Sequence, residues 1–186
     1  MSEEEIVYRS FTLEEWLKLE NIEESMPNIV GHYQETSLAT IDYNCLSWAV
    51  GRIDTYLDPE LNHVGYTWPD NVEREWTAKG CSKVLAHYGY SEESGDTSFE
   101  DDYVKVVMYV DKSGTPTHFA RQIHGGKWTS KLGDKVDIVH DNLECMAGDD
   151  FEHYGTVRYI FRKRAQKAIW PPIDENGPTN TTPSLP

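Results

Sequence analysis

The spacing of the apolar residues changes part-way along the chain, and this change limits the possible folds more than any other feature. From residue 45 apolar residues recur at intervals of three and four, namely Leu46, Ala49, Val50, Ile53 and Leu57. This spacing predicts a helix with one buried face, and Pro59 would end it. From residue 104 the pattern alternates instead, and one face carries Val104, Val106, Met108 and Val110. Alternation is typical of a β-strand.

Capping residues predict two more helices in the N-terminal half. Thr12 and Glu15 form a capping-box pattern ahead of an apolar run, so a short helix is expected to end near Asn21 or Ile22. Asp70 or Asn71 can cap another helix, which would continue to Tyr88 and stop at Gly89.

The C-terminal half continues as strands joined by turns. Further strands are expected at residues 117–124, 127–131 and 156–162, and Gly125-Gly126 can form the turn between the first two. Helices followed by hairpin-linked strands predict an α+β fold, with N-terminal helices packed on an antiparallel β-sheet. We expect a helical extension over residues 1–35, the α+β domain over residues 36–165 and a disordered tail over residues 166–186, which is rich in Pro, Asn and Thr.

Charge limits the classes of partner. The chain has 17 Lys and Arg against 32 Asp and Glu, a formal net charge of -15. Such a field repels phosphate backbones and anionic lipids, which excludes nucleic acid and membrane surfaces as partners and disfavours anionic cell-wall polymers as substrates. The acidic stretch at residues 91–102 is expected to form a surface loop. The first ten residues contain three glutamates and no apolar run, so a cytoplasmic location and free thiols at Cys45, Cys81 and Cys145 are expected.

The segment from Asp42 to Gly51, DYNCLSWAVG, carries the most chemical information. Asn44 or Asp42 can cap the helix, which would put Cys45 in its first turn. Unpaired N–H groups and the helix dipole at that position stabilise a thiolate, which lowers the thiol pKa and makes Cys45 a candidate nucleophile. The alternative is that Cys45 is a plain core residue.

A nucleophilic thiol needs a base, and His118 is the candidate. It lies at the start of an expected strand, on a face that is otherwise small or polar, with Ala120 and Gln122. His118 could accept the thiol proton and later deliver it to a leaving amine. The alternative is a half-buried sheet histidine that hydrogen-bonds a neighbour.

A Cys at the start of a helix in NCLSWAVG, followed by a sheet whose early strand carries His in THFARQ, resembles the papain-like superfamily of cysteine hydrolases, in particular its compact NlpC/P60-type members. The chain is also similar to a group of uncharacterised bacterial proteins with the ordered motifs NC-L-x-W-A, THFARQ, W-x-SKLG and Tyr-Gly. These motifs lie at residues 44–49, 117–122, 128–133 and 154–155, and the resemblance spans residues 40–163.

The resemblance implies a papain-like fold and a Cys–His pair, Cys45 and His118, with a polar residue that orients the imidazole. That residue usually comes from the following strand, where Ser130 is the first candidate, with Thr129, Gln122 and Asp134 as alternatives. The face that Ser130 occupies depends on the length of the hairpin loop. Oxyanion or substrate contacts are expected from Asn44, Trp48 and Gln122.

Two function classes remain. The first is a thiol hydrolase that cleaves an amide bond in a peptide or protein substrate, as a peptidase, amidase or deamidase. The second is a non-catalytic acidic binding protein of the immunity type, which would engage a basic protein partner. No cofactor is expected, because no phosphate-binding or dinucleotide fingerprint occurs, and no metal is expected, because the Cys and His residues lack zinc-ligand spacing.

Overall fold

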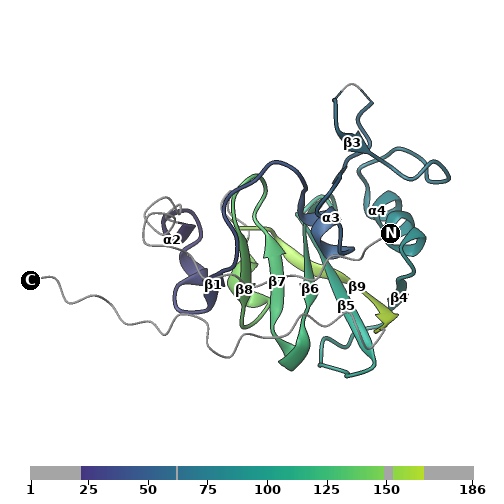
Figure 1. The fold of residues 1–186 in the computed structure, drawn as a ribbon. Helices are drawn as coiled ribbons and strands as arrows, with labels where there is room; N and C mark the ends of the chain where they lie inside the picture. The colour runs from purple at the N-terminus through teal and green to yellow at the C-terminus, as the bar shows by residue number, and fades with distance from the viewer. Residues whose placement is uncertain (1–21, 62, 149–152, 166–186) are drawn as a thin grey trace, which may run out of the picture.

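The computed structural model describes residues 22–61, 63–148 and 153–165. One antiparallel sheet of seven strands dominates it, in the order β1-β8-β7-β6-β5-β9-β4 (Figure 1). Its strands are β1 (Tyr33–Glu35), β4 (Ser91–Glu93), β5 (Tyr103–Val110), β6 (Pro116–Gln122), β7 (Trp128–Lys131), β8 (Asp137–His140) and β9 (Thr156–Arg164). A separate parallel pair consists of β2 (Tyr56–Leu57) and β3 (Tyr66–Thr67).

The helices of the described residues are short. They are α2 (Ile22–Ser25), α3 (Cys45–Ala49) and α4 (Ala78–His87), with the 3₁₀ turns η1 (Pro27–Ile29), η2 (His124–Gly126) and η3 (Glu144–Met146). The predicted α+β fold, with N-terminal helices packed on a sheet in a papain-like arrangement, is therefore wrong, because the described chain is mostly β. The expected helix at residues 12–22 lies outside the described residues except for Ile22.

Two predicted helices are shorter than expected, for local reasons. α3 ends at Ala49, and the chain turns at Gly51, whose φ of 83° favours glycine. Leu57 belongs to β2 and not to a continued helix. α4 begins after Thr77, whose hydroxyl accepts a hydrogen bond from the Gly80 amide at 3.0 Å. Its cap is therefore Thr77 and not Asp70 or Asn71.

Hydrophobic cores lie on both faces of the sheet. On β5, the alternation predicted from the sequence is confirmed, because Val104, Val106, Met108 and Val110 all pack in the core that also holds residues of α3 and α4. The intervening Val107 and Tyr109 pack on the other face, together with residues of α2, η1 and η3. β5 and its neighbour β6 thus separate two apolar layers.

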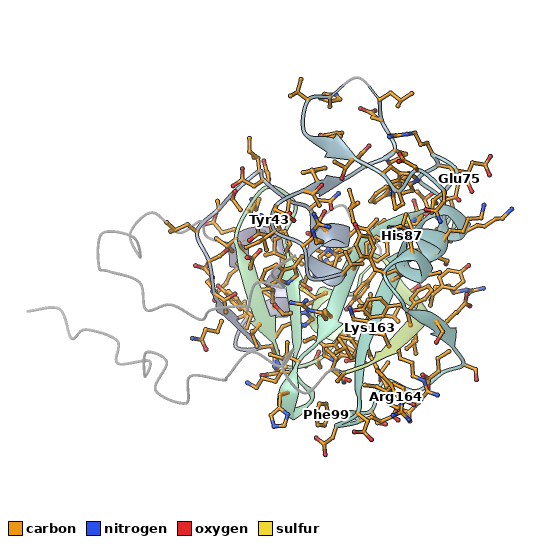
Figure 2. All side chains as sticks on the ribbon, turned by 45° about the vertical axis from the view of Figure 1, so that its right-hand side comes forward. Tyr43, Glu75, His87, Phe99, Lys163 and Arg164 are labelled. Carbon is orange, nitrogen blue, oxygen red and sulfur yellow. The ribbon has the colours of Figure 1, made fainter. Side chains whose placement is uncertain are left out.

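The acidic stretch lies at the surface, as expected, but it is a loop only from residue 94 onward. Its first three residues form β4, which pairs with β9. Lys105 is fully buried and pairs with Glu100 at 2.7 Å, and its ammonium also donates to the Asp96 carbonyl at 3.0 Å. Arg162 pairs with Glu93 at 2.7 Å. Figure 2 shows Phe99 of this stretch at the end of the sheet opposite to Tyr43.

Strand β1 lies within the segment expected to be an N-terminal extension, and it pairs with β8 at the edge of the sheet. Residues 1–21 and the expected tail at 166–186 lie outside the described residues. In the described part, no helix has the length and apolar character needed to cross a membrane.

Candidate functional site

The predicted nucleophile lies where expected, at the first position of α3, and Asn44 is its N-cap. The Asn44 side-chain oxygen accepts from the Ser47 amide at 3.0 Å and from the Ser47 hydroxyl at 2.9 Å. Its amide nitrogen donates to the Leu57 carbonyl at 2.8 Å. Both ends of the buried Asn44 amide are therefore engaged in joining α3 to β2. The Asn44 side chain therefore fixes the start of α3, where Cys45 lies, and its amide N–H group is already used by the Leu57 carbonyl.

The Cys45 thiol does not have the lowered pKa that its position at a helix start predicted. Cys45 is half-buried as a residue, but its sulfur is enclosed, and burial raises the thiol pKa to about 11. Backbone N–H groups of Phe119, Leu46 and Cys45 itself act in the opposite direction. The pKa is raised because a helix of five residues has a small dipole, which does not offset the desolvation of the thiolate.

The contact with Phe119 arises at a point where two strands separate. β6 and β7 pair from Ala120 with Ser130 to Gln122 with Trp128. Neither His118 nor Phe119 has a β7 partner in this ladder. The Phe119 amide is thereby able to approach the Cys45 sulfur.

His118 is buried, with 1% of its surface exposed, and it lies among aromatic rings. Its ring stacks on Tyr154 with centroids 4.1 Å apart and is tilted against Tyr109 at 5.7 Å. Among the described residues, neither ring nitrogen has a hydrogen-bond partner. Burial, together with the charge of His140, lowers the His118 pKa to about 3, so the imidazole is neutral near neutral pH.

Cys45 and His118 approach the same part of β6 from different sides. The sulfur reaches the Phe119 amide from the layer of α3, whereas the ring of the preceding residue, His118, lies in the layer that holds Tyr109. Tyr154 connects the two, because it stacks on His118 and its pKa is raised by burial and then by the Cys45 thiolate. No hydrogen bond joins the pair in the described part of the chain. The Cys45 thiol and the His118 imidazole are therefore both neutral near neutral pH.

Ser130, the expected third member, contacts a different histidine. Its hydroxyl lies 3.0 Å from Nε2 of His140, while Nδ1 of that ring lies 2.7 Å from the Asn142 carbonyl oxygen. A carbonyl only accepts, so Nδ1 carries the proton and Nε2 accepts from Ser130. Ser130 thus orients His140, and its hydroxyl is not directed to His118.

Cys145 contacts His140, but this Cys–His contact does not activate the thiol. Cys145 Sγ lies 3.6 Å from His140 Nδ1, but that nitrogen already donates to Asn142. The Cys145 thiol itself donates to the Asn142 carbonyl at 3.0 Å, and burial raises its pKa to about 11. Cys145 and Cys81 are buried, and all three cysteines are free.

Trp48 and Gln122, the other expected substrate contacts, both have structural partners. The Trp48 indole donates to the Thr129 hydroxyl at 3.2 Å, and the Arg121 guanidinium lies 5.3 Å from its ring centroid. Gln122 donates to the Thr97 carbonyl at 2.9 Å in the acidic stretch. It is four residues from His118, about 13 Å along the strand, at the other end of β6. Gln122 therefore lies away from the site, whereas Trp48 remains beside it.

Sequence reasoning missed a buried polar group beside α3, consisting of Tyr43, Lys131 and Asp137. The Tyr43 hydroxyl donates to Asp137 at 2.5 Å, and the Lys131 ammonium lies 5.4 Å from the Tyr43 ring centroid. Lys131 and Asp137 are 0% and 2% exposed. In the sequence, Lys131 and Asp137 lie on either side of the turn at Gly133, and the pairing of β7 with β8 makes them cross-strand neighbours.

No cluster of three or more His, Cys, Asp or Glu side chains in the described residues is arranged to hold a metal ion.

The structure defines a mostly β domain, with one seven-stranded antiparallel sheet and with the Cys45 thiol and the His118 imidazole on different sides of β6. A family model described as "Domain of unknown function (DUF7689)" matches residues 34–162, and the chain belongs to this family. The match extends from β1 to β9, so it includes Cys45 and His118. No curated protein and no solved structure matches the chain.

Proposed function

We propose that the chain is a thiol hydrolase that cleaves an amide bond in a peptide or protein substrate, with Cys45 as nucleophile and His118 as base. The observation that carries this proposal is the position of the Cys45 sulfur against the amide of Phe119, directly after a buried histidine whose ring nitrogens have no partner among the described residues. A buried polar ring without partners costs free energy, which favours a functional role for it.

In the proposed reaction, the Cys45 sulfur attacks the substrate carbonyl carbon and forms a C–S bond. The thiol proton moves to a ring nitrogen of His118, which then protonates the leaving amine as the C–N bond breaks. Water then attacks the thioester carbon and gives one proton to His118. The C–S bond breaks, the acid product leaves, and His118 passes the proton to the Cys45 sulfur. Backbone N–H groups near the sulfur are available to the negative carbonyl oxygen.

The pKa values of the two groups determine the kind of mechanism. With the Cys45 pKa raised to about 11 and the His118 pKa lowered to about 3, a resting thiolate–imidazolium pair is unfavourable. Proton transfer would then accompany C–S bond formation, as in general-base catalysis. The same values favour the second candidate, a non-catalytic acidic binding protein, and one experiment separates the two.

That experiment measures acylation of Cys45 by 4-nitrophenyl acetate, followed by nitrophenolate release and by mass spectrometry of the Cys45 peptide. A hydrolase predicts that Cys45→Ser abolishes the acyl adduct and that His118→Ala slows its formation by at least about 10²-fold. Cys145→Ala and His87→Ala are the matched controls, because Cys145 is buried in the other apolar layer, on η3, and His87 is exposed on α4. Acylation that is unchanged in folded His118→Ala would reject the hydrolase and select the binding protein.

A further inference from the structure

Lys131 is a buried cation at the point where β6 and β7 separate. Because Ala120 pairs with Ser130, the next residues outward are Phe119 on β6 and Lys131 on β7, and they flank the gap. The Lys131 ammonium donates to the Lys135 carbonyl in the turn after β7 and lies 5.4 Å from the Tyr43 ring centroid. The cation is thus enclosed on the α3 side of the sheet.

Tyr43 and Asp137 hold this ammonium in place. Asp137 is the cross-strand partner of Lys131, and it accepts the Tyr43 hydroxyl at 2.5 Å. Its second oxygen has no hydrogen-bond partner in the described part of the chain. Tyr43 also stacks on Trp48 of α3 at 5.6 Å and precedes Cys45 by two residues. Figure 2 shows Tyr43 beside α3.

We propose that Lys131 supplies the positive charge that stabilises the Cys45 thiolate, and that Tyr43 and Asp137 position its ammonium. The inference rests on the proposed function, in which this sulfur is the nucleophile. His118 is buried and neutral, so it cannot provide the counter-charge before it accepts a proton. Lys131 is therefore a positioning residue that acts through Cys45, and an imidazolium is not required in the resting site.

The groups around this pair determine the sign of the effect. The ionisable groups that face Cys45 or Lys131 are Asp42, Tyr56, Cys81, Asp134, Asp137 and Tyr154. Those beside Cys45 are neutral or themselves acidic, and the charge that acts favourably on the thiolate is that of Lys131. Asp137 carries the opposite charge and weakens this field, whereas Arg121 acts on Asp137 from β6. Removing Lys131 and removing Asp137 should therefore have opposite effects.

The test is the pH dependence of Cys45 alkylation by iodoacetamide, measured by mass spectrometry of the Cys45 peptide in the full chain. Below the thiol pKa, the rate follows the thiolate fraction, so one pKa unit changes it by about tenfold. We expect Lys131→Met to slow alkylation by about tenfold and Lys131→Arg to restore most of the rate. Lys127→Met is the matched control, because Lys127 directly precedes β7, at the end opposite to Lys131, and pairs with Asp141 at 2.9 Å.

Asp137→Asn provides a second measurement with the opposite sign. It removes the anion beside the ammonium, and we expect alkylation to become about three- to tenfold faster. A general loss of packing would change both alkylation rates in the same direction, whereas a charge effect changes them in opposite directions. Circular dichroism is used to check that each variant is folded. If Lys131→Met does not fold, Asp137→Asn still decides. Unchanged rates in folded Lys131→Met, or a slower or unchanged rate in Asp137→Asn, would overturn the proposal.

The alkylation and acylation assays test the two proposals separately. A charge effect of Lys131 on alkylation without any effect of His118→Ala on acylation would reject the hydrolase and leave the charge assignment in place. Normal dependence of acylation on His118 with no effect of Lys131 would reject only the charge assignment.

Discussion

His118 and His140 are buried on the same face of the sheet, and burial lowers their pKa values to about 3 and about 4. Ser130 and the Asn142 carbonyl hydrogen-bond the His140 ring, whereas the His118 ring has only aromatic neighbours in the described residues. A hydrogen-bonded histidine is explained by packing alone. A buried histidine without hydrogen bonds, such as His118 in the described residues, requires another explanation, and the proposed role as a base supplies one.

These two histidines predict a loss of stability in mild acid. Unfolded histidine has a pKa of about 6.5. Because both folded values are lower, the unfolded chain binds more protons below that pH, and the stabilising contribution present above about pH 6.5 is lost as pH falls towards 4. From the pKa difference, the free energy of unfolding in urea should decrease by about 2–4 kcal/mol between about pH 6.5 and 5.

The variant that tests this pH dependence is His118→Phe, which keeps a ring against Tyr154 and removes one titrating group. It should flatten the dependence by about half, while His87→Asn on the surface should leave it unchanged. An equally steep loss in His118→Phe would show that other groups cause the acid effect.

At the scale of elements, the sequence predicted the three long strands and the short strand β7, which follows the Gly125-Gly126 turn, and it missed the other short strands of the large sheet. β5, β6, β7 and β9 lie close to their expected ranges, because alternation within one strand is visible without its partner. β1, β4 and β8 have only three or four residues, and their existence depends on pairing with distant strands. The apolar spacing after Cys45 was misleading, because Leu57 packs in the same core from β2.

Only the part of the site that depends on neighbouring residues in the sequence was predictable. Asn44 as cap and Cys45 in the first turn followed from capping preferences, and both are confirmed. The thiol pKa was not predictable, because burial of the sulfur comes from contacts of α3 with β6, which local sequence does not contain. The partner of Ser130 depended on the face that β7 presents, and this required the β8 pairing as well.

The same elements give a prediction for the acidic stretch. Lys105 joins β5 to this stretch through Glu100 and the Asp96 carbonyl. Lys105→Met should remove both contacts, reduce the free energy of unfolding by about 1–3 kcal/mol and increase amide hydrogen exchange at residues 94–102. Lys79→Met on the exposed side of α4 is the control. Exchange that stays as slow as in the parent chain would show that other contacts hold the stretch.

The whole molecule depends on one sheet that is shared by two apolar layers. β1 pairs with β8 and β4 pairs with β9, so a strand near the start of the described chain and a strand from its middle both pair with strands of its last third. Such distant pairing is typical of domains that fold in milliseconds to seconds. The site also depends on this sheet, because Cys45 comes from the α3 layer and His118 from the other. Loss of either layer should therefore disrupt the site together with the fold.

Val106 and Val107 test this coupling, because they are adjacent on β5, both fully buried, and face opposite layers. Each Val→Ala change removes two methyl groups and should cost about 1–3 kcal/mol, from lost burial and the cavity left behind. In a single cooperative unit, both variants lower the urea midpoint, and tryptophan fluorescence and far-ultraviolet circular dichroism give the same transition in each. A variant in which the two probes separate would show that the layers unfold independently, and the adjacent valine serves as its matched control.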